Sequence, residues 1–245
     1  MNSGVLAIYD LIASEPYKCT LPTSRKLSKA NANSFDIQDV GQGNIIVIHK
    51  SAHIGDKTEI RLSGSNNILY VGRDCYLREA SVEMKGQAGA VIFSNRSGTT
   101  AGKIKLTGNG SGVALGWRAS WGGGAAMAAE GKCIVVSDDC MLSNDVLLRT
   151  SDSHGIFDLE SRERINPAKD VVVGDHVWLG NGVRVNKGSR IARGCIVAQG
   201  AIVAGRLDDQ HSIYAGTPAQ RKRSGISWSR TGNYDDIPSI YRDII

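Results

Sequence analysis

The residue best suited to chemistry in this 245-residue chain is a histidine in a polar segment, His154 in Ser151-Asp-Ser-His-Gly-Ile-Phe-Asp. A free imidazole has a pKa of about 6.5, so at neutral pH it can take a proton from a hydroxyl as a general base. Its other ring nitrogen then needs an acceptor that orients the ring. Asp152, Asp158 or a main-chain carbonyl could be that acceptor, and the sequence does not choose among them. Most histidines in polar loops only face solvent, so the position of this one decides its interpretation.

A six-residue repeat follows this histidine and defines the elements that must position it. Six hexads run unbroken from Val173 to Asp208, and their fifth places hold nothing larger than Leu. A period of six fits neither the 3.6 of a helix nor a simple alternating strand, but it fits a short strand and a sharp corner in repetition. We therefore predict stacked coils of parallel strands, with the aliphatic first places forming a buried column. These first places are Val173, Leu179, Val185, Ile191, Val197 and Val203.

The repeat continues less regularly towards the N-terminus, where hexads begin at Ile54 and Val71. We predict coils from about Asn44 to Leu207 and two loop excursions, near 117-130 and 153-171. The first is rich in Gly and Ala, and the second contains His154 at the point where the frame breaks. Loops on a rigid scaffold often carry function. The two tryptophans of the first excursion are either an exposed acceptor platform or, as we favour, packing beneath the loop; they are Trp117 and Trp121.

Three regions result from this pattern: an N-terminal cap segment over 1-43, a β-helix domain over 44-218 and a C-terminal extension over 219-245. A cap is expected because an open end of a coil stack needs covering. The extension begins with a basic run and ends with apolar residues at helical spacing, which predicts a helix packed on the coils or on a neighbouring subunit. Those apolar residues are Tyr234, Ile237, Ile240, Tyr241 and Ile244.

From about Cys133 to Arg223 the sequence resembles the hexapeptide-repeat acyltransferases, in particular the galactoside, maltose and polysialic-acid O-acetyltransferases. The resemblance rests on the hexads, on His154 with Trp178 24 residues later in Asp175-His-Val-Trp-Leu-Gly, and on the closing Gly-Thr-Pro-Ala turn. It implies an all-β fold, a left-handed parallel β-helix with three hexads per coil. It also implies a homotrimer with active sites between subunits.

The activity that this resemblance implies is transfer of an acetyl group from acetyl-coenzyme A to a sugar hydroxyl, with His154 as the general base. Trp178 would contact the thioester arm or the acceptor, although a tryptophan there could equally cover the outside of the coil. We expect direct attack of the acceptor on the thioester, because no Ser or Cys stands beside His154 in a nucleophile motif. The acceptor would be a saccharide, namely a bacterial surface polysaccharide or its precursor.

The resemblance also carries coenzyme A contacts onto single positions of this chain. Relatives more often have Ala at the place of Gln199 and a Thr-Lys pair at the place of Ala204 and Gly205, so we expect mainly backbone contacts there. Cations suit the 3′-phosphate of the donor, although a solvated charge run is the alternative. The donor-binding residues implied in this way are Asn181, Gln199, Ala204, Gly205, Arg221 and Arg223.

The amino-acid composition argues against several other classes of protein. The net charge is +5 and the pI about 9.0, but the cations are spread along the chain and no nucleic-acid-binding motif accompanies them, so no nucleic acid is predicted. Five cysteines without a Cys-x-x-Cys spacing indicate reduced thiols and a cytoplasmic protein. Neither a signal peptide nor a transmembrane segment is recognisable. Some related helices hold zinc with three histidines, but His154 and His176 lack a third nearby and His176 occupies an outward corner, so no metal is predicted.

Two other functions stay open at this level. One is an N-acyltransferase that modifies an amino sugar. The other is a non-catalytic β-helix that serves as a binding or assembly module. Release of thiol from acetyl-coenzyme A distinguishes an enzyme from a module.

Overall fold

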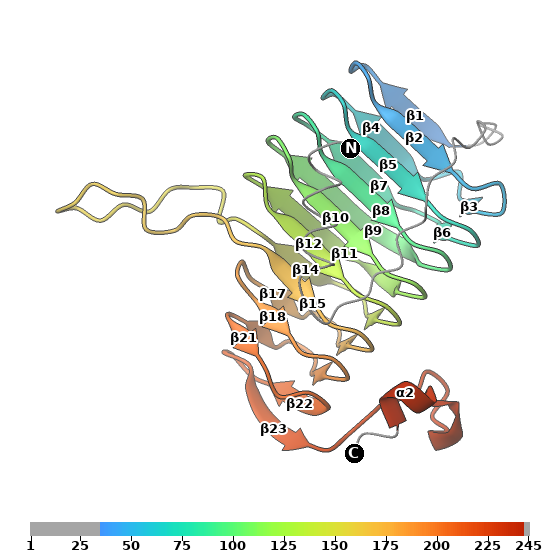
Figure 1. Cartoon of the computed structure of the whole chain (residues 1–245), viewed down its shortest axis with the longest axis vertical. Coiled ribbons are helices and arrows are strands. Elements are labelled where there is room, and N and C mark those ends of the chain that lie inside the picture. The colour runs from blue at the N-terminus through green and yellow to red at the C-terminus, as the bar shows by residue number, and fades with distance from the viewer. Residues whose placement is uncertain (1–34, 243–245) are drawn as a thin grey trace.

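The protein is described by a computed structural model that places residues 35–242. It is a stack of parallel coils whose strands lie on three faces, so that the molecule is a three-faced prism (Figure 1). Face 1 is one eight-stranded sheet. Its strands, in order, are β2 (Ile45–Ile48), β5 (Ile68–Val71), β8 (Ala90–Phe93), β10 (Gly112–Leu115), β12 (Cys133–Val136), β15 (Val171–Val173), β18 (Arg190–Ile191) and β21 (Arg206–Leu207).

Faces 2 and 3 share two long strands, β9 (Gly98–Thr107) and β11 (Ser120–Ala129), which bend from one face onto the next. Face 2 also contains β3 (His53–Ile54), β6 (Tyr76–Leu77), β13 (Met141–Leu142), β16 (Trp178–Leu179), β19 (Ile196–Val197) and β22 (Ser212–Ala215), and β23 (Gln220–Ser224) pairs antiparallel with β22. Face 3 also contains β1 (Asp36–Asp39), β4 (Glu59–Leu62), β7 (Ser81–Met84), β14 (Val146–Arg149), β17 (Arg184–Val185) and β20 (Ile202–Val203). We name the three edges by the faces they join: edge 1–2, edge 2–3 and edge 3–1.

The predicted buried column is confirmed. All six first places of the C-terminal hexads, from Val173 to Val203, have no exposed surface. Successive coils place these residues in direct register, as in the pairing of Leu179 with Val197. Two of the small fifth places are cysteines, Cys140 and Cys195, and both are buried free thiols. The core is therefore a single stripe of apolar side chains along the axis of the prism.

The predicted loop excursion at 117-130 is wrong, because this segment is mostly the strand β11. Its small residues do not form a loop but make room where the strand crosses edge 2–3. A Cβ on Gly124, which has φ +130°, would lie 2.1 Å from the carbonyl oxygen of Val146 on the next coil. A Cβ on Gly102 would lie 2.6 Å from the indole of Trp121.

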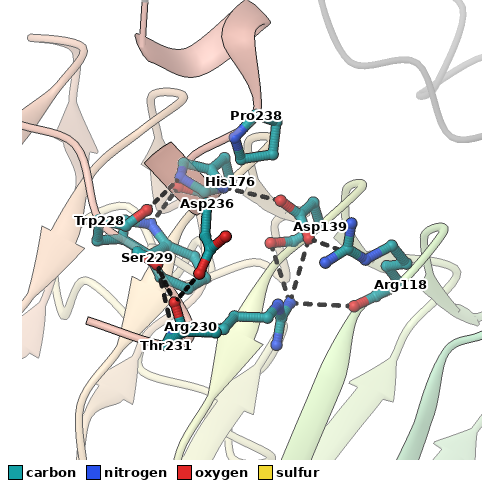
Figure 2. Close-up of a pocket in the computed structure, with 9 residues that line it drawn as sticks. All are labelled: Arg118, Asp139, His176, Trp228, Ser229, Arg230, Thr231, Asp236 and Pro238. Carbon is teal, nitrogen blue, oxygen red and sulfur yellow. Dashed lines mark hydrogen bonds and ion pairs between the residues drawn. The ribbon is translucent and has the colours of Figure 1, made fainter. Parts of the chain in front are cut away.

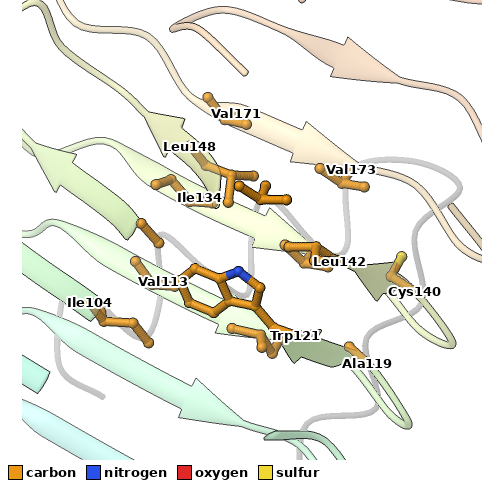
Figure 3. Close-up of a cluster of buried hydrophobic side chains, with 14 of the residues drawn as sticks. Ile104, Val113, Ala119, Trp121, Ile134, Cys140, Leu142, Leu148, Val171 and Val173 are labelled. Atoms are coloured by element: carbon orange, nitrogen blue, oxygen red, sulfur yellow. The ribbon is translucent and has the colours of Figure 1, made fainter. Parts of the chain in front are cut away.

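Trp121 fills the space that Gly102, on β9 of the preceding coil, leaves, and 1% of its surface is exposed (Figure 3). Its indole N–H donates to the carbonyl of Gly123 at 2.8 Å. The favoured interpretation of this residue, packing, is confirmed. Trp117 is partly buried, and the guanidinium of Arg118 lies 5.1 Å from its ring centroid.

The N-terminal end of the coil stack differs from the predicted boundary. The first strand, β1, begins at Asp36, eight residues before the predicted start at Asn44, and pairs in parallel with β4. The rest of the predicted cap, up to residue 34, lies outside the described residues.

Within residues 35–242 no helix is long and apolar enough to cross a membrane.

The C-terminal segment returns to the prism after β23. It contains a 3-10 turn (Tyr234–Asp236) and one short helix, α2 (Ser239–Arg242). Of the apolar residues predicted to share one helix face, Ile237 and Tyr241 are buried, whereas Tyr234 and Ile240 are exposed. The helix is too short to present a continuous stripe, and Ile244 lies outside the described residues.

Candidate active site

His154 lies at the base of a long excursion between β14 and β15, which we call the arm (residues 153–170). The arm projects away from the prism at edge 3–1 and carries only an isolated antiparallel bridge between Phe157 and Arg164 (Figure 1). The His154 side chain is exposed, but its backbone is fixed. Its carbonyl accepts a hydrogen bond of 2.9 Å from the side-chain amide of Asn166, which accepts in turn from the N–H of Ile156 at 2.6 Å.

Charged residues of neighbouring coils fasten the base of the arm. Arg164 of the arm donates two hydrogen bonds to Glu130, at 2.6 and 3.1 Å, and the hydroxyl of Ser151 donates to the same carboxylate. These hydrogen bonds lower the pKa of Glu130 to about 2, so the carboxylate stays charged. Lys187, one coil further on, binds the backbone carbonyl of Asn166 at 2.9 Å.

Neither carboxylate proposed to orient His154 binds its ring. Asp152 accepts instead from Lys187 and from the amide of Asn166, and these hydrogen bonds lower its pKa. Asp158 lies far out on the arm and closes a turn by accepting from the N–H and hydroxyl of Ser161, at 2.8 and 3.0 Å. Within the described chain neither carboxylate contacts the imidazole, and each accepts from other donors.

Trp178 lies on face 2, on the outward side of β16, and is half-buried. Its row neighbours on adjacent coils are Met141 and Ile196. The indole N–H has one acceptor, the hydroxyl of Ser143 at 3.5 Å. Because the arm leaves from edge 3–1, a single chain does not bring His154 and Trp178 into contact among the residues that are described.

The predicted donor-binding residues are divided between two edges. Asn181 and Gln199 occupy successive corners of edge 2–3, where the N–H of Gly200 donates to the carbonyl of Asn181 at 2.8 Å. Both side chains are exposed. Ala204 and Gly205 lie instead at edge 3–1, after β20, near the base of the arm. The donor-binding residues that the resemblance implies thus lie on two surfaces and do not form one continuous site.

The two arginines of the basic turn stand on β23 and differ in their partners. Arg221 forms an ion pair of 3.0 Å with Asp209. Arg223 lies opposite Ile213 in the antiparallel pair, is exposed, and forms no ion pair with any described residue. Arg223 is therefore the freer of the two cations.

The sequence interpretation missed a buried polar cluster that lies apart from the base of the arm. His176 does occupy an outward corner, at edge 1–2 with φ +52°, but the C-terminal segment 226–242 covers it, so that only 1% of its surface is exposed. We call this segment the strap. His176 Nδ1 lies 2.9 Å from the carboxylate of Asp139, and Nε2 lies 3.0 Å from the carbonyl of Trp228 (Figure 2). No local pattern signals this, because 52 residues separate His176 from Trp228.

The strap and edge 1–2 together form an open pocket of about 290 Å³, lined in part by Arg118, Asp139 and Arg230 (Figure 2). Burial alone would raise the pKa of Asp139. The hydrogen bond with His176 and the guanidinium groups of Arg230 and Arg118 outweigh burial and lower that pKa. At nearby Asp175 burial outweighs the hydrogen bond from the N–H of Asp138 and the charge of Arg193, and it raises the pKa to about 6. No group of three or more His, Cys, Asp or Glu side chains suited to a metal ion occurs within residues 35–242.

Known proteins share this architecture. No family model matches the chain. A polysialic acid O-acetyltransferase of Neisseria meningitidis is 31% identical over 140 residues, which are 57% of this chain and 64% of that protein. One from Escherichia coli O1:K1 / APEC is 42% identical over 122 residues, which are 50% of this chain and 39% of that protein. The chain thus matches less than two thirds of the length of either curated relative.

Solved structures extend the likeness over most of the described chain. The polysialic acid O-acetyltransferase OatWY superposes with a TM-score of 0.78 at 27% identity, over 83% of this chain and 97% of that one. The polysialic-acid-specific acetyltransferase NeuO superposes with a TM-score of 0.54 at 28% identity, over 81% of this chain and 90% of that one.

The chain is a left-handed parallel β-helix built from hexapeptide repeats, as predicted, and it shares this fold with the acetyltransferase OatWY. The predicted resemblance to the polysialic-acid O-acetyltransferase branch is confirmed.

Proposed function

We propose that this protein transfers an acetyl group from acetyl-coenzyme A to a hydroxyl of a bacterial surface polysaccharide, with polysialic acid as the first acceptor to test. The observation that carries the proposal is the arm. It lifts His154 out of an otherwise regular coil stack and fixes its backbone through Asn166, in a chain that is similar over most of its length to an O-acetyltransferase of known structure. The reduced state of the four described cysteines fits action in the cytoplasm.

In this mechanism the imidazole of His154 accepts the proton of the acceptor hydroxyl as its oxygen attacks the thioester carbonyl carbon. The new C–O bond forms, the C–S bond breaks, and the coenzyme A thiolate leaves and takes up the proton that the imidazolium returns. The exposed position of His154 allows a large polymeric acceptor to approach. No acetyl-enzyme is required, because the acceptor attacks the donor directly.

We infer further that a second copy of the chain completes the site, as in a homotrimer. His154 stands at edge 3–1 and Trp178 on face 2 of the same coil stack, so one chain presents them on separate surfaces. An arm that projects from one subunit can reach the outward face of its neighbour. Oligomeric sites of this kind bury the reacting groups without a lid.

The donor would lie along edge 2–3, with Asn181 and Gln199 contributing backbone and amide groups and Arg223 meeting the 3′-phosphate. Arg221 would contribute less, because Asp209 already neutralises it. Ala204 and Gly205, at edge 3–1, would contact the donor only through a neighbouring subunit.

The test is acetyl transfer to polysialic acid. It is measured by the release of thiol from the donor and by detection of the O-acetylated product. Replacing His154 with Ala should lower kcat by about 100-fold or more and leave coenzyme A affinity nearly unchanged, since a general base acts mainly in the transition state. His53→Ala is a matched control, because His53 is also exposed but lies on a distant coil. A His154→Ala enzyme that keeps most of its turnover contradicts the base assignment. A trapped acetyl-enzyme contradicts direct transfer.

A further inference from the structure

The strap holds an aromatic stack that the proposed mechanism does not use. The ring of His176 stacks on the indole of Trp228, with centroids 4.3 Å apart and planes 9° apart. It also stacks on the ring of Tyr241, at 4.2 Å and 4°. Two rings can each lie this close and parallel to a third only on its opposite faces. His176 is therefore enclosed between two residues of the strap.

Trp228 is fixed in this stack more firmly than by packing alone. Its indole N–H donates to the carbonyl of His176 at 2.8 Å, and its own carbonyl contacts Nε2 of His176. Two residues further on, the guanidinium of Arg230 donates to the hydroxyl of Ser120 at 2.7 Å and to the carbonyl of Cys140 at 3.0 Å. The strap is thus anchored to three successive coils around Trp228.

This fixed indole also meets the ring of Trp178. The two rings are tilted by 48°, with centroids 6.1 Å apart, a favourable geometry for an aromatic pair. Trp178 needs such a neighbour, because its strand is only two residues long and its single hydrogen bond, to Ser143, is 3.5 Å long. Hydrogen bonding within the coil therefore restrains this side chain only weakly.

We propose that Trp228 is a positioning residue that holds Trp178 in the orientation required for acyl transfer. This inference rests on the proposed function, in which Trp178 contacts the thioester arm or the acceptor. Small errors in the placement of such a group reduce turnover strongly, by up to about 100-fold for a shift near 1 Å. The strap is then part of the site and not only a cover for edge 1–2.

The strap itself supplies a matched pair of variants. Trp228 and Tyr241 are equally buried, each with 5% of its surface exposed, and both stack on His176, but of these two rings only that of Trp228 pairs with the ring of Trp178. Trp228→Leu should lower kcat by about 10-fold or more with the coenzyme A Kd within about 2-fold, the pattern for a lost transition-state interaction. Tyr241→Leu should keep kcat within about 3-fold. Trp228→Phe, which keeps an aromatic ring, should restore most of the turnover.

A second readout does not depend on activity. In protein labelled with 5-fluorotryptophan, the fluorine signal of Trp178 is assigned by its loss in Trp178→Phe. It should shift or broaden in Trp228→Leu and stay in place in Tyr241→Leu. Equal losses of kcat in the two leucine variants, or an unmoved Trp178 signal in Trp228→Leu, overturn the proposal. If the wild-type protein transfers no acetyl group, the proposed function fails, and the fluorine signal alone decides whether Trp228 orients Trp178.

Discussion

The two halves of the β-helix have coils of different length. In the N-terminal half, residues paired between successive coils are 21 to 23 apart in sequence and most often 22, as Ser81 with Lys103 and Ala90 with Gly112. In the coils that follow the arm they are 16 to 18 apart and most often 18, as Trp178 with Ile196. We call these the wide and the tight coils. The four additional residues lengthen strands and not loops, because the wide coils have four-residue strands on faces 1 and 3.

This difference explains why the hexad pattern fades although the core does not. A two-residue strand gives one inward side chain per six residues, whereas a four-residue strand gives two inward side chains and shifts the frame. Both halves still bury a continuous apolar column, since Val91 in a wide coil and Val197 in a tight coil have no exposed surface. Regularity of sequence therefore reports coil length, and not the quality of the core.

The largest effect that tests this comparison is a charge in the column. Val197→Asp buries an unpaired carboxylate and should lower the free energy of unfolding by roughly 3–5 kcal/mol. Val91→Asp should cost the same if the column of the wide coils is equally closed. Thermal and denaturant unfolding measure both. Where the aspartate variants do not fold, Val197→Thr and Val91→Thr place a hydroxyl at the same sites, at about 1–3 kcal/mol each.

Equal losses would show that the wide coils are as tightly packed as the tight ones. A variant at Val91 that unfolds like the parent, beside a strongly destabilised variant at Val197, would break the comparison and confine the essential core to the hexads.

Sequence patterns predicted the fold of the tight coils and the position of the arm, because both depend on the spacing of residues along the chain. They missed the wide coils at β11, where glycines that looked like a loop allow close approach to neighbouring coils, as Gly124 does to the backbone of Val146. The contacts that shape the site were also beyond reach. Glu130 meets Arg164 and Lys187 meets Asp152 across coils, 34 and 35 residues apart in sequence. Such pairs are set by stacking register, which no local pattern encodes.

An intermediate effect concerns the donor, whose predicted contacts all lie on or beyond the tight coils. Arg223→Gln should raise the KM for acetyl-coenzyme A by about 10-fold, the loss of one charge-assisted contact, and leave the KM for the dephospho donor almost unchanged. Arg221→Gln should have a smaller effect, since Arg221 already pairs with Asp209. Lys103→Gln, an exposed cation of a wide coil, is the control. If the KM changes equally for both donors, the basic turn is a solvated surface and does not bind the 3′-phosphate.

The smallest expected effect is on stability, and it distinguishes an aspartate of each half that lies at edge 1–2. There a wide coil carries the exposed Asp74, in a 4.0 Å ion pair with Arg96, whereas a tight coil carries the largely buried Asp175. Burial raises the pKa of Asp175 from 3.8 to about 6, so the folded protein holds this proton more tightly than the unfolded chain. The stability that this proton contributes is complete below about pH 4 and is lost as the pH rises to about 6.

Asp175→Asn removes the charge and keeps an acceptor for the N–H of Asp138, which lies 3.3 Å from the carboxylate. The variant should match the parent in stability at pH 4 and exceed it by about 1 kcal/mol at pH 7, because partial solvent access screens the full cost of the charge. Unfolding by urea at a series of pH values measures this. Asp74→Asn should change stability by no more than about 0.5 kcal/mol, as for other exposed ion pairs. If Asp175→Asn is less stable than the parent at pH 7, the carboxylate is charged and favourably held, and edge 1–2 does not tighten towards the C-terminal coils.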